Sequence, residues 1–131
     1  MSTLIIEKAK LKNLKDLIHL LFDDDLGKDR ENISETSFNN YKKSFMKILN
    51  DTNNEIFIMV LNDQIIGMMQ LTFIPGLSME GMTRCQIESV RIKKDYRNKG
   101  YGSELIKKGI EIAKLNECGL MQLTSNKKRP R

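Results

Sequence analysis

Hydrophobic residues recur along this chain at two different spacings. Spacings of three and four residues place apolar side chains on one face of a helix, whereas short apolar or alternating runs are typical of strands. The helical spacing occurs in three segments, which are 13–22, 38–49 and 102–115. Strand-like runs occur in five segments, which are 4–9, 56–61, 65–73, 85–92 and 120–124. The pattern therefore predicts a mixed α/β domain of the α+β type.

The connections between these segments predict how the strands pair. Turn residues at 62–64 join two apolar runs, which predicts an antiparallel hairpin. The order of the last three elements is strand (85–92), helix (102–115) and strand (120–124). This order predicts a right-handed crossover between two parallel strands. We therefore expect a mixed, mostly antiparallel sheet flanked by helices. Because Pro75 and Gly76 interrupt the pattern, residues 78–81 are predicted to form a mobile loop.

A basic, glycine-containing loop between the strand at 85–92 and the last helix is the strongest candidate for a functional site. It carries Arg97, Gly100 and Gly102 in the pattern R-x-x-G-x-G. The first N–H groups of a helix lack intrahelical acceptors and carry partial positive charge, so they bind anions. Glycines allow phosphate oxygens to approach the backbone closely. The alternative is a plain glycine-rich connection with solvated lysines. The patterns of a P-loop and of a dinucleotide-binding fold are absent from the sequence.

Composition narrows the classes of partner. The 131 residues fit one domain, and the net charge of +5 suits an anionic ligand or a nucleic acid. The basic segments lack interleaved aromatic residues, which disfavours nucleic acid. We expect no membrane partner, and a cytoplasmic protein, because the sequence has neither an apolar run of membrane-spanning length nor a secretory signal. Cys85 and Cys118 lack the spacing of metal ligands, so we expect no metal.

Three segments together resemble the GNAT superfamily of acyl-CoA-dependent N-acetyltransferases. These segments are the strand at 86–92 with its acidic Glu88, the loop at 97–102, and residues 123–126. The loop is similar to the family's Q/R-x-x-G-x-G/A motif. The order of elements agrees with the family from residue 4 to residue 126, so the resemblance covers nearly the whole chain.

The resemblance implies a GNAT fold, with acetyl-CoA as co-substrate. Its pantetheine arm would lie between two parallel strands that splay apart, and would bind the backbone of the strand at 90–92. Its pyrophosphate would lie on the N–H groups of residues 98–103. The residues implied in cofactor binding are Val90, Arg91, Ile92, Arg97, Asn98, Lys99, Gly100, Tyr101, Gly102, Ser103 and Asn126.

The implied chemistry is the transfer of an acetyl group to an amine by direct attack on a thioester. Because alkylamines are mostly protonated at pH 7, a base is useful, and Glu88 is the candidate catalytic residue, acting through a water. Strand alternation predicts that Glu88 shares a face with Val90 and Ile92. The alternative is that Glu88 pairs with a nearby arginine such as Arg84. The backbone N–H of Val90 is the candidate donor to the oxyanion.

The resemblance also implies a further helix that bears a tyrosine, followed by a final strand pair. The sequence stops at Arg131, so we expect a single domain over 1–131 without those elements. Two explanations stay open, which are a shortened chain and a second subunit, for instance in a homodimer, that covers the open sheet edge. The acceptor is expected to be a small-molecule or peptide amine. The acidic residues at 23–25 are candidates to attract it, and the alternative is a solvated helix end. Alternative functions are a non-catalytic acyl-CoA-binding or regulatory module and a basic nucleic-acid-binding domain.

Overall fold

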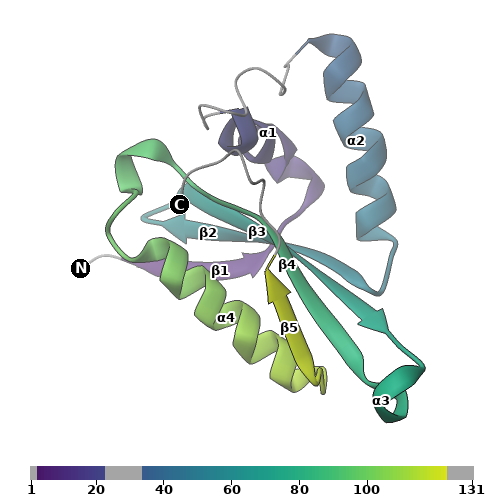
Figure 1. Ribbon diagram of the computed structural model, residues 1–131. Coiled ribbons are helices and arrows are strands. Elements are labelled where there is room, and N and C mark those ends of the chain that lie inside the picture. Colours follow the sequence, from purple (N-terminus) through teal and green to yellow (C-terminus); the bar gives the residue numbers. More distant parts are fainter. Residues whose placement is uncertain (1–2, 23–33, 124–131) are drawn as a thin grey trace.

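A five-stranded sheet with the strand order β1-β2-β3-β4-β5 is the centre of the computed structural model, which describes residues 3–22 and 34–123 (Figure 1). Its strands are β1 (Leu4–Lys8), β2 (Asn54–Leu61), β3 (Gln64–Pro75), β4 (Thr83–Ile92) and β5 (Leu120–Leu123). The helices are α1 (Leu14–Phe22), α2 (Glu35–Leu49), α3 (Ser78–Gly81) and α4 (Tyr101–Leu115), with 3₁₀ turns at Leu11–Asn13 and Lys94–Tyr96. Among the helices so described, none is long and apolar enough to cross a membrane.

Strand pairing confirms the mixed sheet predicted from the sequence. The pairs β1–β2, β2–β3 and β3–β4 are antiparallel, whereas the pair β4–β5 is parallel. Asn62 and Asp63 form the turn between β2 and β3 with positive φ angles of 48° and 69°, as a tight hairpin turn requires. The parallel pair is joined through α4, because a parallel connection must cross over the sheet.

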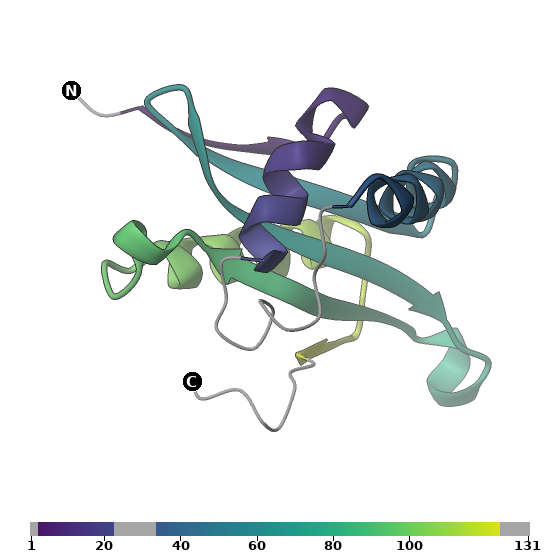
Figure 2. The same ribbon diagram turned by 90° about the horizontal axis from the view of Figure 1, so that it is seen from above.

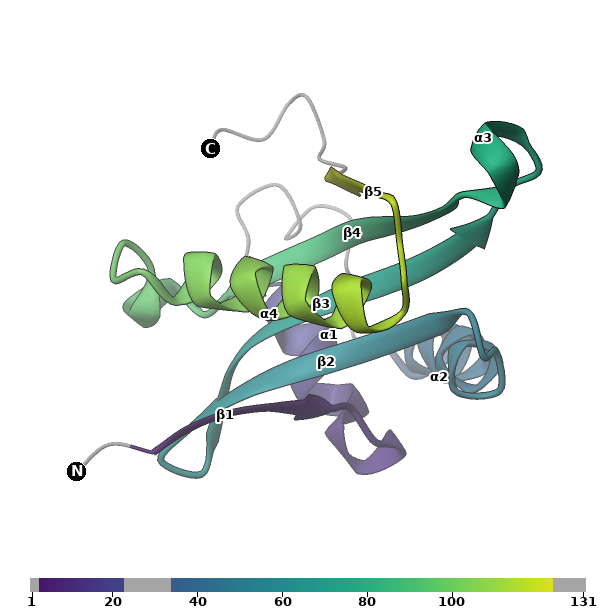
Figure 3. The same cartoon turned by 90° about the horizontal axis from the view of Figure 1, so that it is seen from below.

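The helices cover the two faces of the sheet separately. Figure 2 shows α1 and α2 on one face, and Figure 3 shows α4 on the other. Two hydrophobic clusters result, and adjacent residues of β3 belong to different clusters, with Met68 on the face of α1 and α2 and Met69 on the face of α4. We refer to these as the α1/α2 face and the α4 face. The single sheet therefore lies between two cores.

The strand β4 contains a β-bulge that the sequence pattern does not reveal. Gln70 pairs with Glu88, and the next pair is Met68 with Arg91, so two residues of β4 lie opposite Met69. Ser89, the first of these two, has a φ of 54°, which non-glycine residues rarely adopt. A bulge inserts one residue into a strand and so changes which face the following side chains occupy.

The tip between β3 and β4 also differs from the prediction. Residues 78–81, which the sequence predicts as a mobile loop, form the short helical element α3. Met79 and Glu80 have φ angles of 53° and 60°, so this turn is left-handed. Neither residue is a glycine or an asparagine, the types that usually indicate such a conformation, so the sequence carried no local signal for it.

Candidate active site

In the described residues, β4 pairs with β5 only along its first half. The pairs between β4 and β5 run from Arg84–Leu120 to Ile87–Leu123, and Leu123 is the last residue that the structure describes. From residue 88 to residue 92, the described partner of β4 is β3 alone. This stretch includes Val90, Arg91 and Ile92, the backbone that the sequence predicts to hold a pantetheine arm. Splaying of β4 from β5 stays a prediction.

The loop after β4 is anchored to the sheet at its start. Lys93 donates its N–H to the carbonyl of Ile66 at 2.7 Å, and the Nε of Arg97 donates to the carbonyl of Ile92 at 2.9 Å. The arginine of the R-x-x-G-x-G pattern therefore holds the loop against the end of β4. Because its anchors lie at the strand end, the loop brings the start of α4 next to the second half of β4.

The N-terminus of α4 is open to an anion. Its N-cap is Gly100, in the left-handed conformation with a φ of 87°, and no side chain caps the helix. The first N–H groups of α4, at residues 101–103, have no intrahelical acceptor, and the helix macrodipole adds partial positive charge there. A Cβ on Gly102 would have Ile92 Cγ1 at 3.9 Å, an ordinary contact, so alanine also fits there. The predicted strand, loop and helix arrangement is confirmed.

Two tyrosines pack beside this loop. The ring centroids of Tyr96 and Tyr101 are 6.3 Å apart, and both side chains pack against the core on the α4 face. The Nζ of Lys99 lies 6.0 Å from the centroid of the Tyr96 ring. Tyr96 also donates its hydroxyl to Oε1 of Gln64 at 3.3 Å. The tyrosines therefore stabilise the loop that precedes α4.

Glu88 lies immediately before the bulge and is half-buried. Its Oε1 accepts a hydrogen bond from Nε2 of Gln86 at 3.3 Å. Glu88 pairs with Gln70 on the α1/α2 face, whereas Val90 and Ile92 pack on the α4 face. The prediction that these three residues share a face is wrong, because the bulge at Ser89 interrupts the alternation.

The alternative partner of Glu88 is engaged elsewhere. The Nη1 of Arg84 donates to Oε1 of Gln122 on β5 at 3.2 Å. Within the part of the chain that the structure describes, the ion pairs do not include one between Arg84 and Glu88. The carboxylate therefore accepts from the amide of Gln86, and Arg84 does not pair with it.

Neither cysteine offers a nucleophile near neutral pH. Burial raises the pKa of the Cys85 thiol to about 11, and burial also raises the pKa of Cys118. Both thiols are free and protonated at pH 7. The described residues contain no group of three potential metal ligands.

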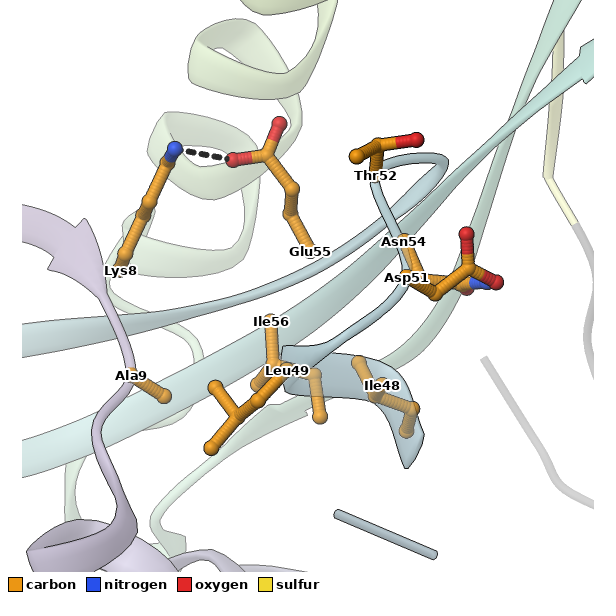
Figure 4. Close-up of a pocket in the computed structure, with 9 residues that line it drawn as sticks. All are labelled: Lys8, Ala9, Ile48, Leu49, Asp51, Thr52, Asn54, Glu55 and Ile56. Carbon is orange, nitrogen blue, oxygen red and sulfur yellow. Dashed lines mark hydrogen bonds and ion pairs between the residues drawn. The ribbon is translucent and has the colours of Figure 1, made fainter. Parts of the chain in front are cut away.

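A pocket of about 330 Å³ lies at the other edge of the sheet (Figure 4). It is lined by the end of β1, the C-terminal end of α2 and the start of β2. Lys8 on β1 and Glu55 on β2 form an ion pair of 2.8 Å there. Because β1 and β2 are separated from β4 and β5 by β3, this pocket is not part of the candidate site.

Some predicted site residues lie outside the described residues. These are Asn126, predicted to touch the cofactor, and the acidic residues at 23–25. The sequence prediction in turn missed Ser89 and Gln86. A serine within an apolar strand gives no sign of a bulge, and a glutamine two residues before a glutamate gives no sign of contact until strand geometry is known.

Comparison with known proteins identifies the family. Residues 14–129 match the model of the acetyltransferase (GNAT) family. The chain belongs to this family. The GNAT resemblance of the sequence and the predicted fold class are thereby confirmed. A comparison with curated proteins gives no match.

Solved structures agree with the GNAT fold. A transcriptional regulator from Bacillus halodurans C-125 is 38% identical, with a TM-score of 0.91, over 98% of this chain and 85% of that one. A GNAT family acetyltransferase from Staphylococcus aureus is 21% identical, with a TM-score of 0.77, over 100% and 92% of the two chains. A predicted acetyltransferase from Clostridium acetobutylicum, solved with acetyl-CoA, is 17% identical, with a TM-score of 0.75, over 97% and 84%.

Proposed function

We propose that this GNAT protein transfers the acetyl group of acetyl-CoA to a primary amine of a small molecule or peptide. The observation that carries the proposal is the uncapped N-terminus of α4 beside the second half of β4. Family membership supports acyl transfer in general. The choice of acetyl-CoA is supported by its presence in the Clostridium acetobutylicum structure. In this proposal the protein is cytoplasmic, and a second copy covers the β5 edge.

The residues present fit a coenzyme A at two points. The N–H groups at 98–103 suit a pyrophosphate, because Gly100 leaves the helix end without a cap and Gly102 leaves it without a side chain. The backbone at 90–92 offers polar groups on the edge that β3 does not occupy. Lys93, Lys94 and Lys99 add positive charge around the loop. When bound, acetyl-CoA supplies the activated acyl group.

The proposed chemistry divides between the two faces of β4. Glu88, on the α1/α2 face, takes a proton from the ammonium form of the acceptor, directly or through a water, so that a neutral amine attacks. The N–H of Val90, within the bulge, is the proposed donor to the oxyanion that develops on the thioester carbonyl. The C–N bond forms, the thioester C–S bond breaks, and coenzyme A leaves as the thiol with the proton that the attacking nitrogen loses. Gln86 holds the carboxylate through its hydrogen bond to Glu88. We assign Gln86 as a positioning residue.

A second candidate is a regulatory module that binds acyl-CoA without turnover. It is favoured by one observation, which is that the 38% identical relative is described as a transcriptional regulator. The two candidates share the cofactor site and differ in turnover. Binding of acetyl-CoA without release of a free thiol, over a broad panel of amines, would favour the regulatory module.

The cofactor assignment is tested at Gly102. We expect Gly102→Val to weaken acetyl-CoA binding in calorimetry by at least about tenfold, which is roughly 1.4 kcal/mol, because its methyl groups occupy the anion site. Gly102→Ala is the matched control, because a Cβ there makes only an ordinary contact, and we expect its affinity to stay within about threefold of the wild type. Equal affinity of the valine variant and the wild type would contradict the assignment. Absence of acetyl-CoA binding by the wild type would contradict the proposed function itself.

A further inference from the structure

Polar side chains form a row across the α1/α2 face of the sheet, from β2 to β5. The register of the strands places them on this one face, and each is half-buried. The row consists of Asn54, Gln70, Thr72, Arg84, Gln86, Glu88 and Gln122. We call these residues the polar row. It lies on the face that Glu88 occupies and opposite α4.

The packing of the fold does not account for the polar row. The hydrophobic cluster under α1 and α2 draws its strand residues from β2 and β3, and none of the described residues of β4 or β5 belongs to it. Apart from Leu120, the described β4 and β5 residues on this face are polar, whereas the neighbouring portion is apolar. Polar side chains that are half-buried on a sheet face and not needed for a core are available to a ligand.

Hydrogen bonds within the polar row orient its side chains. The Oδ1 of Asn54 accepts from Nε2 of Gln70 at 3.2 Å and from Oγ1 of Thr72 at 2.8 Å. Further along the row, Gln86 donates to Glu88, and Arg84 donates to Gln122. The contacts of Asn54 link β2 to β3, the contact of Arg84 links β4 to β5, and the Gln86–Glu88 contact lies within β4, so a ligand would meet a largely preorganised surface.

Charge in the polar row lies at two positions of β4; a third charged residue of β4 on this face, Arg91, lies beyond the bulge and outside the row. Glu88 is negative and Arg84 is positive, and they are four residues apart on the same face. At a rise of about 3.3 Å per residue, their Cα atoms are roughly 13 Å apart. Gln86 lies between them and Gln70 lies beside Glu88, whereas Arg84 is flanked by Ile74 of β3 and Leu120 of β5. A ligand complementary to this pattern carries a cation at one end, an anion at the other, and hydrogen-bonding groups between.

We propose that the polar row binds the acceptor, and that the acceptor carries an anionic group, a carboxylate or a phosphate, in addition to its amine. This inference rests on the proposed function. The amine lies at Glu88 and the anion lies at Arg84, which can form charge-assisted, bidentate hydrogen bonds with such a group. A tripeptide has a suitable reach, since three extended residues span about 10 Å. A polyamine does not fit, because a second cation would lie against Arg84.

The test compares acceptors that differ in one charge. Acetyl transfer to triglycine is measured against triglycine amide, with an aminoalkyl phosphate of similar length and spermidine as further arms. We expect wild-type kcat/KM to be at least about tenfold higher for triglycine than for its amide, the range of a charge-assisted hydrogen bond. Comparison of the aminoalkyl phosphate with triglycine shows whether phosphate or carboxylate is preferred, because the preferred anion gives the higher kcat/KM.

Variants at Arg84 assign the preference to its side chain. In Arg84→Gln, the ratio between triglycine and its amide should fall to about one, mainly through KM, whereas Arg84→Lys should restore part of it. Affinity for acetyl-CoA should stay unchanged in both. Lys114→Gln, an exposed residue near the end of α4, is the matched control for loss of one positive charge. A wild-type protein indifferent to the carboxylate, or an Arg84→Gln variant that keeps the preference, would overturn the inference.

A binding measurement separates this inference from the proposed function. Calorimetry of triglycine and its amide with the wild-type protein, saturated with coenzyme A, requires no turnover. Tighter binding of triglycine, lost in Arg84→Gln, supports the inference even where transfer fails. If acetyl transfer occurs but triglycine and its amide bind equally well, the proposed function stands and the inference is wrong. Binding of neither peptide also overturns it.

Discussion

At the scale of single residues, Glu88 is the clearest case of a residue whose candidate role was indicated by the sequence and whose face on the sheet was not. Its position on the strand before the R-x-x-G-x-G loop indicated a role from the sequence alone. Its face on the sheet depends on Ser89, where a positive φ shifts the alternation. A backbone conformation of this kind costs on the order of 1–3 kcal/mol and is typical of functional sites. Alternation alone therefore gave the wrong face.

Replacement of the carboxylate tests its proposed role as a base. In Glu88→Gln we expect kcat/KM at pH 7 to fall roughly a hundredfold or more. The deficit should shrink as the pH rises toward about 10, because the fraction of free alkylamine in solution then grows. Pre-steady-state and steady-state acetyl transfer between pH 6 and pH 10 measures this change.

The pH profile distinguishes a base from a purely structural residue. A structural role would lower the rate by the same factor at every pH, so parallel profiles would contradict the assignment of Glu88. Glu80→Gln is the matched control, because Glu80 is an exposed carboxylate on α3, away from β4's bulge. Its rates should equal those of the wild type.

At the scale of elements, α4 approaches the sheet closely through Gly109. A Cβ at this position would lie 3.0 Å from Ile87 Cδ1, closer than most real contacts, and 3.6 Å from Leu71 Cδ2. A glycine within a helix costs about 1 kcal/mol relative to alanine, so its presence here reflects close packing. This packing fixes α4 on β4, and with it the position of the helix N-terminus at the candidate site.

Enlargement of Gly109 should therefore act on stability. In Gly109→Leu we expect the free energy of unfolding to fall by about 1–3 kcal/mol, because the side chain must displace Ile87 or lift α4 from the sheet. Urea denaturation measures the change. Lys107→Leu, on the exposed side of α4, is the control and should change stability by less than about 0.5 kcal/mol. A leucine variant as stable as the wild type would show that α4 does not depend on this contact.

Most elements were predictable because their signals are local. Helical spacing placed α2, and in the structure its N-cap is Ser34, whose Oγ accepts from the N–H of Ser37 at 3.2 Å. Turn residues placed the β2–β3 hairpin. The left-handed turn of α3 and the bulge of β4 had no such signal, because in each case residues other than glycine adopt positive φ under tertiary constraint. Apart from the one between Gln86 and Glu88, the hydrogen bonds of the polar row depend on cross-strand register, which the chain order alone does not specify.

At the scale of the whole molecule, one sheet serves two cores. Leu105 of α4 is fully buried on one face, and Ile18 of α1 is 1% exposed on the other. Because Met68 and Met69 are adjacent in β3 and belong to different cores, loss of one core removes support from the strand that both share. We therefore expect the described domain to unfold cooperatively.

Two matched truncations test this coupling. Leu105→Ala and Ile18→Ala should each lower the free energy of unfolding by about 2–5 kcal/mol, since both remove fully buried methyl groups. Urea denaturation followed by circular dichroism and by tyrosine fluorescence should show one transition in each variant, with coincident midpoints. Separate midpoints for the two probes in either variant would contradict the coupling.

The bulge in β4 has a consequence for how this protein can change over generations. Upstream of Ser89, the even-numbered positions 84, 86 and 88 lie on the α1/α2 face, and beyond it the odd-numbered position 91 does. The alternation of side chains between the two faces of the sheet is therefore shifted by one residue between the first and the second stretch of β4. On the proposed assignment, in which the first stretch binds the acceptor and residues 90–92 bind the donor, substitutions in the first stretch can change which amine is chosen while the second stretch still binds the donor. Acceptor choice can then diversify without loss of the proposed chemistry.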